Sequence, residues 1–197
     1  MVKPAAIGFR MHSGWGALVV VSTDIVLKVV DRTHIVVAEA SIPGSKQPYH
    51  YAENLELKRD EEYIARCCAA SGQLASSAIR DSLSQLQENE YRVERSAILT
   101  GSGRPLPSLE KVLASHALIH AAEGEFFRMV VRKACEYAGI TVTPVREGEL
   151  EELATKTFGE KINQVKEQIS SSGKRLGAPW TRDEKLAASA ASLILAC

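Results

Sequence analysis

The spacing of hydrophobic and polar residues predicts strands at the start of the chain. The segments Ala5–Met11 and Ala17–Ser22 are short and apolar, and the second is rich in the β-branched residues that favour strands. Between them, the stretch HSGWG contains the glycines of a tight turn, so the two segments are predicted to pair as a hairpin. A third apolar stretch follows at Ile25–Ala40, in which DRT indicates a bend or bulge and HIVVAEA is the better strand candidate.

Helical patterns and short strands alternate along the rest of the chain. The predicted elements are a long amphipathic helix from about Lys58 to Asn89, a strand at Ser96–Leu99, a helix at Ser108–Tyr137, a strand at Ile140–Val145, a polar helix from Glu147 to about Ser170, and a final helix capped by Thr181. Right-handed crossovers return helix-connected strands to the same sheet side by side. We therefore predict an α/β fold, with a mixed five-stranded sheet of three antiparallel strands and two helix-connected strands, flanked by helices.

Length and composition predict a single globular domain over residues 1–197. The chain is 45% hydrophobic and 24% charged, which allows a substantial core. Its 24 basic residues cancel its 24 acidic ones, so no bulk charge attracts it to nucleic acid or to an anionic membrane. We find no signal-peptide pattern, no run long enough to span a membrane, and no metal-ligand spacing among the four cysteines. These features predict a cytoplasmic protein with reduced thiols.

Three stretches give the chain a resemblance to a known family. They are the opening AIGFRMHSGWGALVVVS, the helix–strand unit FFRMVVRKACEYAGITVTPV and the late RDEKLAASAASLIL. Together with the order of elements, they resemble the ribonuclease H-like superfamily, and the RuvC-type Holliday-junction resolvases in particular. The resemblance implies a nucleic-acid-associated protein. In the nucleases of that fold, carboxylates at one edge of the sheet hold divalent metals that promote phosphodiester hydrolysis.

Most of the carboxylates that this resemblance requires are missing. The first predicted strand should supply an aspartate, but residues 7–12 contain no acid, and neither do residues 97–100 of the fourth strand. Only Asp183, with Glu184 beside it, stands where a carboxylate of the family is expected. The resemblance therefore implies a degenerate or remodelled acidic site, and the fold alone does not fix the function.

The helix predicted at 108–138 carries the most unusual candidates for chemistry. At about 100° per residue, His116, His120 and Glu123 fall on the same face as the apolar Leu109 and Phe127. Residues three and four positions apart on a helix are neighbours, so the three polar side chains can touch. Burying three ionisable groups together is costly unless they are hydrogen-bonded, paired or bound to a metal.

Three interpretations of this face stay open. His116 and Glu123 can form a satisfied buried network that holds the helix to the sheet. Alternatively, a histidine beside a carboxylate can serve as a general acid or base. His116, His120 and Glu123 can also form a nitrogen and oxygen ligand set for a divalent metal. A metal would need one more ligand, for which His12 at the end of the first strand is the candidate.

Two glycine-containing loops are candidate ligand sites. In HSGWG, Trp15 can stack on a ligand, although a hairpin turn with a packed tryptophan has the same pattern. In LTGSGRP, at Leu99–Pro105, backbone amides and Arg104 can bind a phosphate, although an ordinary turn fits as well.

The basic residues around Trp180, in GKRLGAPWTRDEK, can contact nucleic acid or simply be solvated.

These observations lead to two functional hypotheses. The first is a nucleic-acid-associated, RuvC-like phosphodiesterase that uses a divalent metal and a remodelled catalytic set. That set is His12, His116, His120, Glu123 and Asp183, with His116 or His120 as general base or metal ligand, Asp183 as metal ligand, and Arg104 as phosphate clamp. The second hypothesis is a non-catalytic binding or scaffold module that keeps the fold without the chemistry. In the predicted fold, His12, Arg104, the start of the histidine helix and Asp183 all lie near one edge of the sheet.

Overall fold

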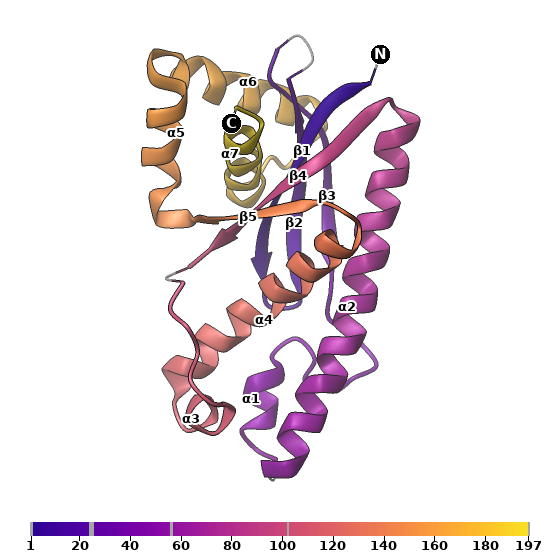
Figure 1. Cartoon of the computed structure of the whole chain (residues 1–197), viewed down its shortest axis with the longest axis vertical. Helices are drawn as coiled ribbons and strands as arrows, with labels where there is room; N and C mark the ends of the chain where they lie inside the picture. The colour runs from indigo at the N-terminus through magenta and orange to yellow at the C-terminus, as the bar shows by residue number, and fades with distance from the viewer. Residues whose placement is uncertain (1, 24–25, 56, 102, 197) are drawn as a thin grey trace.

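A mixed sheet of five strands forms the centre of the molecule (Figure 1). The structure is a computed structural model that describes residues 2–23, 26–55, 57–101 and 103–196. The strands are β1 (Lys3–His12), β2 (Trp15–Ser22), β3 (Lys28–Val36), β4 (Tyr91–Thr100) and β5 (Thr141–Arg146), and they are arranged in the order β3-β2-β1-β4-β5. β2 is antiparallel to β1 and β3, whereas β4 is parallel to β1 and β5. This arrangement confirms the predicted mixed sheet.

Helices cover both faces of the sheet (Figure 1). They are α1 (Pro48–Ala52), α2 (Leu57–Glu88), α3 (Leu109–Leu113), α4 (His116–Tyr137), α5 (Leu150–Phe158), α6 (Ile162–Arg175) and α7 (Arg182–Ala196), with the single turns η1 (Glu147–Glu149) and η2 (Gly159–Lys161) beside α5. α2 and α4 cover one face, and α5, α6 and α7 cover the other. No helix in the described part of the chain is both long and apolar enough to cross a membrane.

Strand β1 is buried on both faces, and its residues alternate between them. Ile7 and Phe9 belong to the core under α2 and α4, whereas Ala6 belongs to the core under α7. Gly8 is the point of closest approach, since a Cβ there would lie 1.9 Å from the carbonyl oxygen of Ala187. α7 therefore packs directly on the backbone of β1.

α1 and α3 lie beyond the sheet, against the first turns of α4 (Figure 1). A small separate core forms there from Val112, Ile119 and Ala122, with Tyr49 and Leu106 packed against it. This core brings a short helix from the first connector next to α4, although the two are far apart in the sequence.

The third strand lies earlier in the chain than predicted. It ends at Val36, so DRT is inside the strand and only the start of HIVVAEA belongs to it. The irregularity is a register shift opposite Val20 and Val21. After the strand, the Val37 amide donates to the Gly14 carbonyl at 2.9 Å, which turns the chain away from the sheet. Ile25, where the predicted stretch begins, lies outside the described residues.

Two predicted helices are each divided in the structure. The helix expected at Ser108–Tyr137 breaks at Ser115, which is extended with φ −140° and ψ 112°. The polar helix after Glu147 breaks at Gly159, whose φ of 53° favours glycine. The predicted cap of the last helix is confirmed, because Thr181 Oγ1 accepts the Glu184 amide at 3.4 Å and the Glu184 carboxylate accepts the Thr181 amide at 2.6 Å.

The contact between α7 and β1 predicts that Gly8→Ala is destabilising. The added methyl group would overlap the Ala187 carbonyl, so we expect the free energy of unfolding to fall by about 1–3 kcal/mol in urea denaturation. Gly72→Ala is the matched control, because no atom lies within 4 Å of a Cβ at this position in α2. Replacing a helical glycine with alanine should stabilise by up to about 1 kcal/mol. Equal stability of Gly8→Ala and the wild type would contradict this packing.

Candidate functional site

Three histidines converge where α1 meets the start of α4. His116 and His120 are one turn apart on α4, and their Nε2 atoms are 3.0 Å apart. The ring of His50, on α1, lies 5.5 Å from that of His116 and 4.8 Å from that of His120, measured between centroids. One ring atom of each histidine lies within 4.8 Å of the other two, so the three can share one metal ion. We call this group the histidine cluster.

Glu123 holds His50 in this position. Its Oε1 accepts the backbone amides of Tyr49 at 2.8 Å and His50 at 3.1 Å, and lies 3.3 Å from His50 Nδ1. These amides belong to the first turn of α1, which receives no side-chain cap from Gln47. The Glu123 side chain, reaching from α4, therefore caps α1 and fixes the His50 ring.

The predicted face of the histidine helix is wrong for His116 and His120, which are both exposed. Both lie on the same face of α4 as the buried Phe127, but they belong to its first turns, which extend beyond the sheet (Figure 1). Glu123 is buried as predicted, yet it bonds to α1 and His50. Glu123 does not belong to the group that can share a metal, so it supports the histidine cluster, in which His50 takes the place expected of the carboxylate.

His50 is absent from the predicted site because it lies between the third predicted strand and the long helix, where the sequence predicts no regular element. A usable signal was present in QPYHYA, where a proline precedes a short run of helix-compatible residues. The contact with Glu123 spans 73 positions, and no local pattern announces a contact of that range.

Burial raises the pKa of the Glu123 carboxyl, and the hydrogen bonds from His50 and Tyr49 oppose this rise without cancelling it. The Glu123 side chain is 4% exposed, and Oε2 has no hydrogen-bond partner among the described residues. A carboxyl whose pKa is raised on folding contributes stability below its unfolded pKa of about 4.3, and this contribution is lost as the pH rises through the folded value. Its negative charge is therefore a local cost that a nearby cation would offset.

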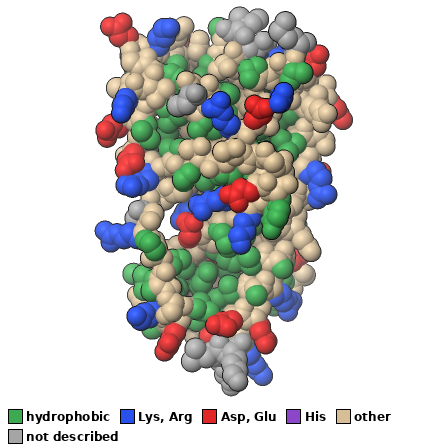
Figure 2. All heavy atoms as spheres, viewed as in Figure 1, with side chains coloured by type: hydrophobic (Ala, Val, Ile, Leu, Met, Phe, Trp, Pro, Cys, Tyr) green, Lys and Arg blue, Asp and Glu red, His purple; other side chains and the backbone are tan. Residues whose placement is uncertain are grey.

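A cleft of about 800 Å³ opens beside His120. It lies at the carboxyl ends of β4 and β5, between the turn after β4, the first half of α4 and the start of α5. Its charged lining residues are Arg104, Arg128, Arg132, Arg146, Glu125 and Glu149. Four arginines against two glutamates leave an excess of positive charge in this arginine-lined cleft. Figure 2 shows charged side chains gathered across the middle of the molecule, below the position of β5 in Figure 1.

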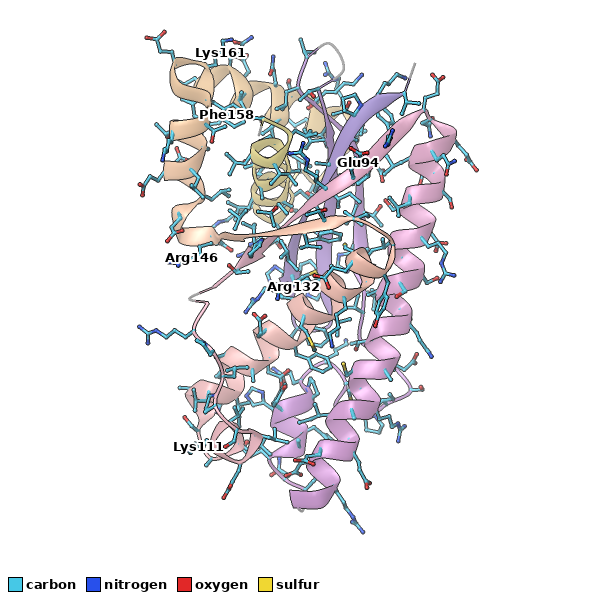
Figure 3. All side chains as sticks on the ribbon, viewed as in Figure 1. Glu94, Lys111, Arg132, Arg146, Phe158 and Lys161 are labelled. Atoms are coloured by element: carbon cyan, nitrogen blue, oxygen red, sulfur yellow. The ribbon has the colours of Figure 1, made fainter. Side chains whose placement is uncertain are left out.

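The arginines of the cleft come from three parts of the chain: Arg104 from the turn after β4, Arg128 and Arg132 from α4, and Arg146 from β5. Arg132 on α4 and Arg146 at the end of β5 are labelled in Figure 3. Arg146 pairs with Glu149 at 2.7 Å, and Glu125 lies 3.1 Å from Arg128 and 3.6 Å from Arg132.

Arg104, the predicted phosphate clamp, lines the same cleft. Its side chain is exposed and makes no ion pair with another residue of the described ranges. Ser102, in the same predicted turn, lies outside the described residues. Guanidinium groups offer several N–H donors in a plane, so the lining suits an oxyanion such as a phosphate.

The ends of β1 and α7 form a second cluster, separate from the first. Arg10 donates to Glu147 through Nε at 3.0 Å and Nη2 at 3.1 Å, and to Asp183 through Nη1. His12 Nε2 lies 2.8 Å from Arg10 Nη1 and 3.0 Å from Asp183 Oδ2. The structure thus brings His12 and Asp183 together as predicted, but joins them to Arg10. Among the described residues, His12 does not belong to the group that can share a metal with His116.

The residues at this edge do not fit the divalent-metal centre that the resemblance implies. The guanidinium of Arg10 lies between Glu147 and Asp183, where a cation would have to be held. Glu184, the other candidate carboxylate, pairs with Arg32 at 2.6 Å and caps α7. The carboxylates of this edge are therefore already paired with arginines.

Trp15 is packed between two imidazoles. Its ring stacks on His12 at 4.3 Å and on His34 at 4.6 Å, with interplanar angles of 12° and 16°. Both faces of the indole are covered, which favours the packed hairpin tryptophan over a stacking platform. A ligand-binding role for Trp15 stays a prediction.

Comparison with solved structures identifies the fold of this chain. No protein-family model matches the chain, and no curated protein matches it. The structure of T. thermophilus RuvC in complex with a Holliday junction substrate aligns with 98% of this chain and 92% of its own, with a TM-score of 0.54 and 12% identity. A second Thermus thermophilus RuvC structure aligns with 98% and 93% of the two chains, with a TM-score of 0.52 and 12% identity. The chain has a RuvC-type, ribonuclease H-like fold. This RuvC-type likeness shows the fold, and the chemistry must be argued from the site.

The raised pKa of Glu123 predicts that Glu123→Gln stabilises the metal-free protein. Glutamine keeps an acceptor for the α1 amides and removes the buried charge, so its advantage over glutamate should grow as the pH rises from about 4 to about 8. Urea denaturation across this range measures the effect. Glu125→Gln is the control, since Glu125 is more exposed and bonds to arginines. If the stability difference between Glu123→Gln and the wild type shrinks as the pH rises, the carboxylate is stabilised by its surroundings and the prediction is wrong.

Proposed function

We propose that this chain is a metal-dependent phosphoesterase that acts on nucleic acid. In this proposal, the histidine cluster binds the metal and the arginine-lined cleft binds the phosphate. The observation that carries the proposal is the position of His120, which belongs to both the cluster and the lining of the cleft. A metal on these imidazoles would face a bound phosphate directly.

Three neutral imidazoles are a suitable ligand set for a hydrolytic zinc or related first-row metal, and they leave a coordination position for water or substrate. Glu123 supports this role because His50 can donate its Nδ1 proton to the carboxylate, which leaves Nε2 for the metal. Carboxylates that orient metal-bound histidines in this way also increase their basicity. The buried negative charge of Glu123 is then offset by the cation.

A bound metal would supply a Lewis acid and a water molecule with a pKa near 7. The chain itself positions the phosphate, because the guanidinium groups of Arg104, Arg128 and Arg146 line the cleft and can neutralise developing charge on its oxygens. Hydrolysis of a phosphodiester consumes one water, breaks one P–O bond and forms another, and the departing oxygen takes up a proton. His116, His120, Glu123 and Arg104 keep roles from the predicted set, whereas His12 and Asp183 leave it.

Nucleic acid is the proposed substrate class for two reasons. The cleft carries excess positive charge although the 24 basic and 24 acidic residues of the whole chain balance. The fold is also that of a resolvase whose structure was determined with a Holliday junction substrate. We propose a cytosolic location, because Cys67 and Cys135 are free thiols of the kind found in reducing compartments. We also propose a single domain, because the described strands form one five-stranded sheet.

A binding module without catalysis is the second candidate. Arg10 fills the edge at which carboxylates are expected, and this favours a chain that has lost the nuclease chemistry of its fold. Under this alternative the arginine-lined cleft binds nucleic acid, and the histidine cluster is an exposed group of imidazoles without a metal.

Metal content distinguishes the two candidates. We expect the purified protein to bind one equivalent of zinc or another first-row metal and to cleave a chromogenic phosphodiester. The double variant His116→Ala/His120→Ala should lose both properties. His34→Ala is the control, because His34 is exposed and lies outside the cluster. Absence of a bound metal, with equal behaviour of the wild type and the double variant, would reject the enzyme and favour the binding module.

The cleft predicts a selective effect of Arg104→Ala on nucleic-acid affinity. Loss of one charge-assisted contact should weaken binding of a single-stranded oligonucleotide about tenfold, and should reduce the slope of log affinity against log salt by about one. Arg92→Ala is the matched control, since the Arg92 side chain is 70% exposed and lies on β4 outside the cleft. An equal effect of the two substitutions would mean that the cleft is not the binding surface.

A further inference from the structure

Arg10 is a partly buried cation that the proposed function does not use. Its side chain is 19% exposed and lies at the end of β1, two residues beyond Gly8 on the face covered by α7. Nε and Nη2 form a two-pronged pair with Glu147, and Nη1 contacts both Asp183 and His12. Glu147 and Asp183 therefore accept three of the five N–H donors of the guanidinium, and Nη1 also lies 2.8 Å from His12 Nε2.

The guanidinium joins three elements that are distant in the sequence. Glu147 opens η1, 137 positions after Arg10, and Asp183 lies in the first turn of α7, 173 positions after it. Burial lowers the pKa of Arg10, but its bonds to Glu147 and the charges of Glu147 and Asp183 outweigh burial and raise it. A permanent positive charge thus faces two carboxylates and one imidazole.

We infer that Arg10 is a built-in cation that takes the place of a divalent metal at this edge of the sheet, and that removing it uncovers a divalent-cation site made of Glu147, Asp183 and His12. The disagreement between these residues and the metal centre expected of the fold carries the inference. It is independent of the proposed function, which uses the histidine cluster.

Simple electrostatics explains why a metal would enter once Arg10 is gone. Breaking a partly buried ion pair on one side leaves charges without compensation, which is strongly unfavourable. Without Arg10, Glu147 would keep a 3.7 Å contact with the exposed Arg182, and Asp183 would keep His12, but both carboxylates would lose their main cation. Two carboxylates with one imidazole form an oxygen and nitrogen ligand set that suits manganese. With Arg10 between them, the three do not form a group of described residues whose ligand atoms all lie within 4.8 Å, so they would have to close on the ion.

A phosphate-binding role for Arg10 fits the structure less well. A phosphate would have to displace Glu147 or Asp183 from donors that are already bonded. Arg104 in the cleft differs in this respect, because it makes no ion pair with another described residue. Arg10 is therefore a closed internal cation.

Manganese binding tests the inference in the His116→Ala/His120→Ala background, in which the histidine cluster cannot contribute. Electron paramagnetic resonance should show that Arg10→Ala in this background binds one equivalent of Mn²⁺, and that Arg10→Ala/Asp183→Asn does not. Arg32→Ala is the matched control, since it removes the partner of Glu184 on the same helix and should gain no site. Failure of Arg10→Ala to bind more Mn²⁺ than Arg32→Ala would overturn the inference.

Thermal unfolding keeps the test decisive if Arg10→Ala is unstable. Manganese should raise the melting temperature of Arg10→Ala, or restore its folding, and should leave the parent background and Arg32→Ala unchanged. Equal responses in all three proteins would contradict a site uncovered at Glu147 and Asp183. Neither result depends on phosphoesterase activity, so the inference and the proposed function can fail separately.

Discussion

The bonds from the buried Glu123 carboxylate to the first turn of α1 are the interaction on which the candidate site depends. They cap the short helix α1 and hold it against α4, which places His50 beside His116 and His120. The cost of this arrangement is a buried negative charge with one unpaired oxygen. Such a cost is reasonable at a site that binds a cation, because the cation repays it when it binds.

Arginine and carboxylate side chains gather at two separate places along the strand ends. At the end of β1, Arg10 pairs with both Glu147 and Asp183 and closes that edge with internal bonds. At the ends of β4 and β5, the arginines instead line a cleft that is open beside His120. The first arrangement stabilises the contact between β1 and α7, and the second leaves guanidinium groups available to a ligand. Under the proposed function, the chemistry lies beside the arginine-lined cleft and not at the end of β1.

The sequence predicts the framework of the fold well, because the framework follows from local periodicity. The hairpin, the long α2 and the Thr181 cap depend on patterns within one element or two consecutive ones. The site is predicted less well, because it depends on contacts between elements. His116 and His120 could be selected by their spacing, but their exposure depends on how far α4 extends beyond the sheet. The QPYHYA pattern favours a short helix at His50, but its contact with Glu123 and the pairing of Arg10 with Asp183 need the tertiary fold.

The central claim is that the histidine cluster is a metal centre, and anomalous diffraction from crystals grown with zinc tests it most directly. We predict one strong peak bound by His50, His116 and His120, with nitrogen–metal distances of about 2.0–2.1 Å. Glu123 should accept a hydrogen bond from His50 on the far side of that ring. A structure with no peak at these histidines, or with its metal between Glu147 and Asp183, would contradict the account.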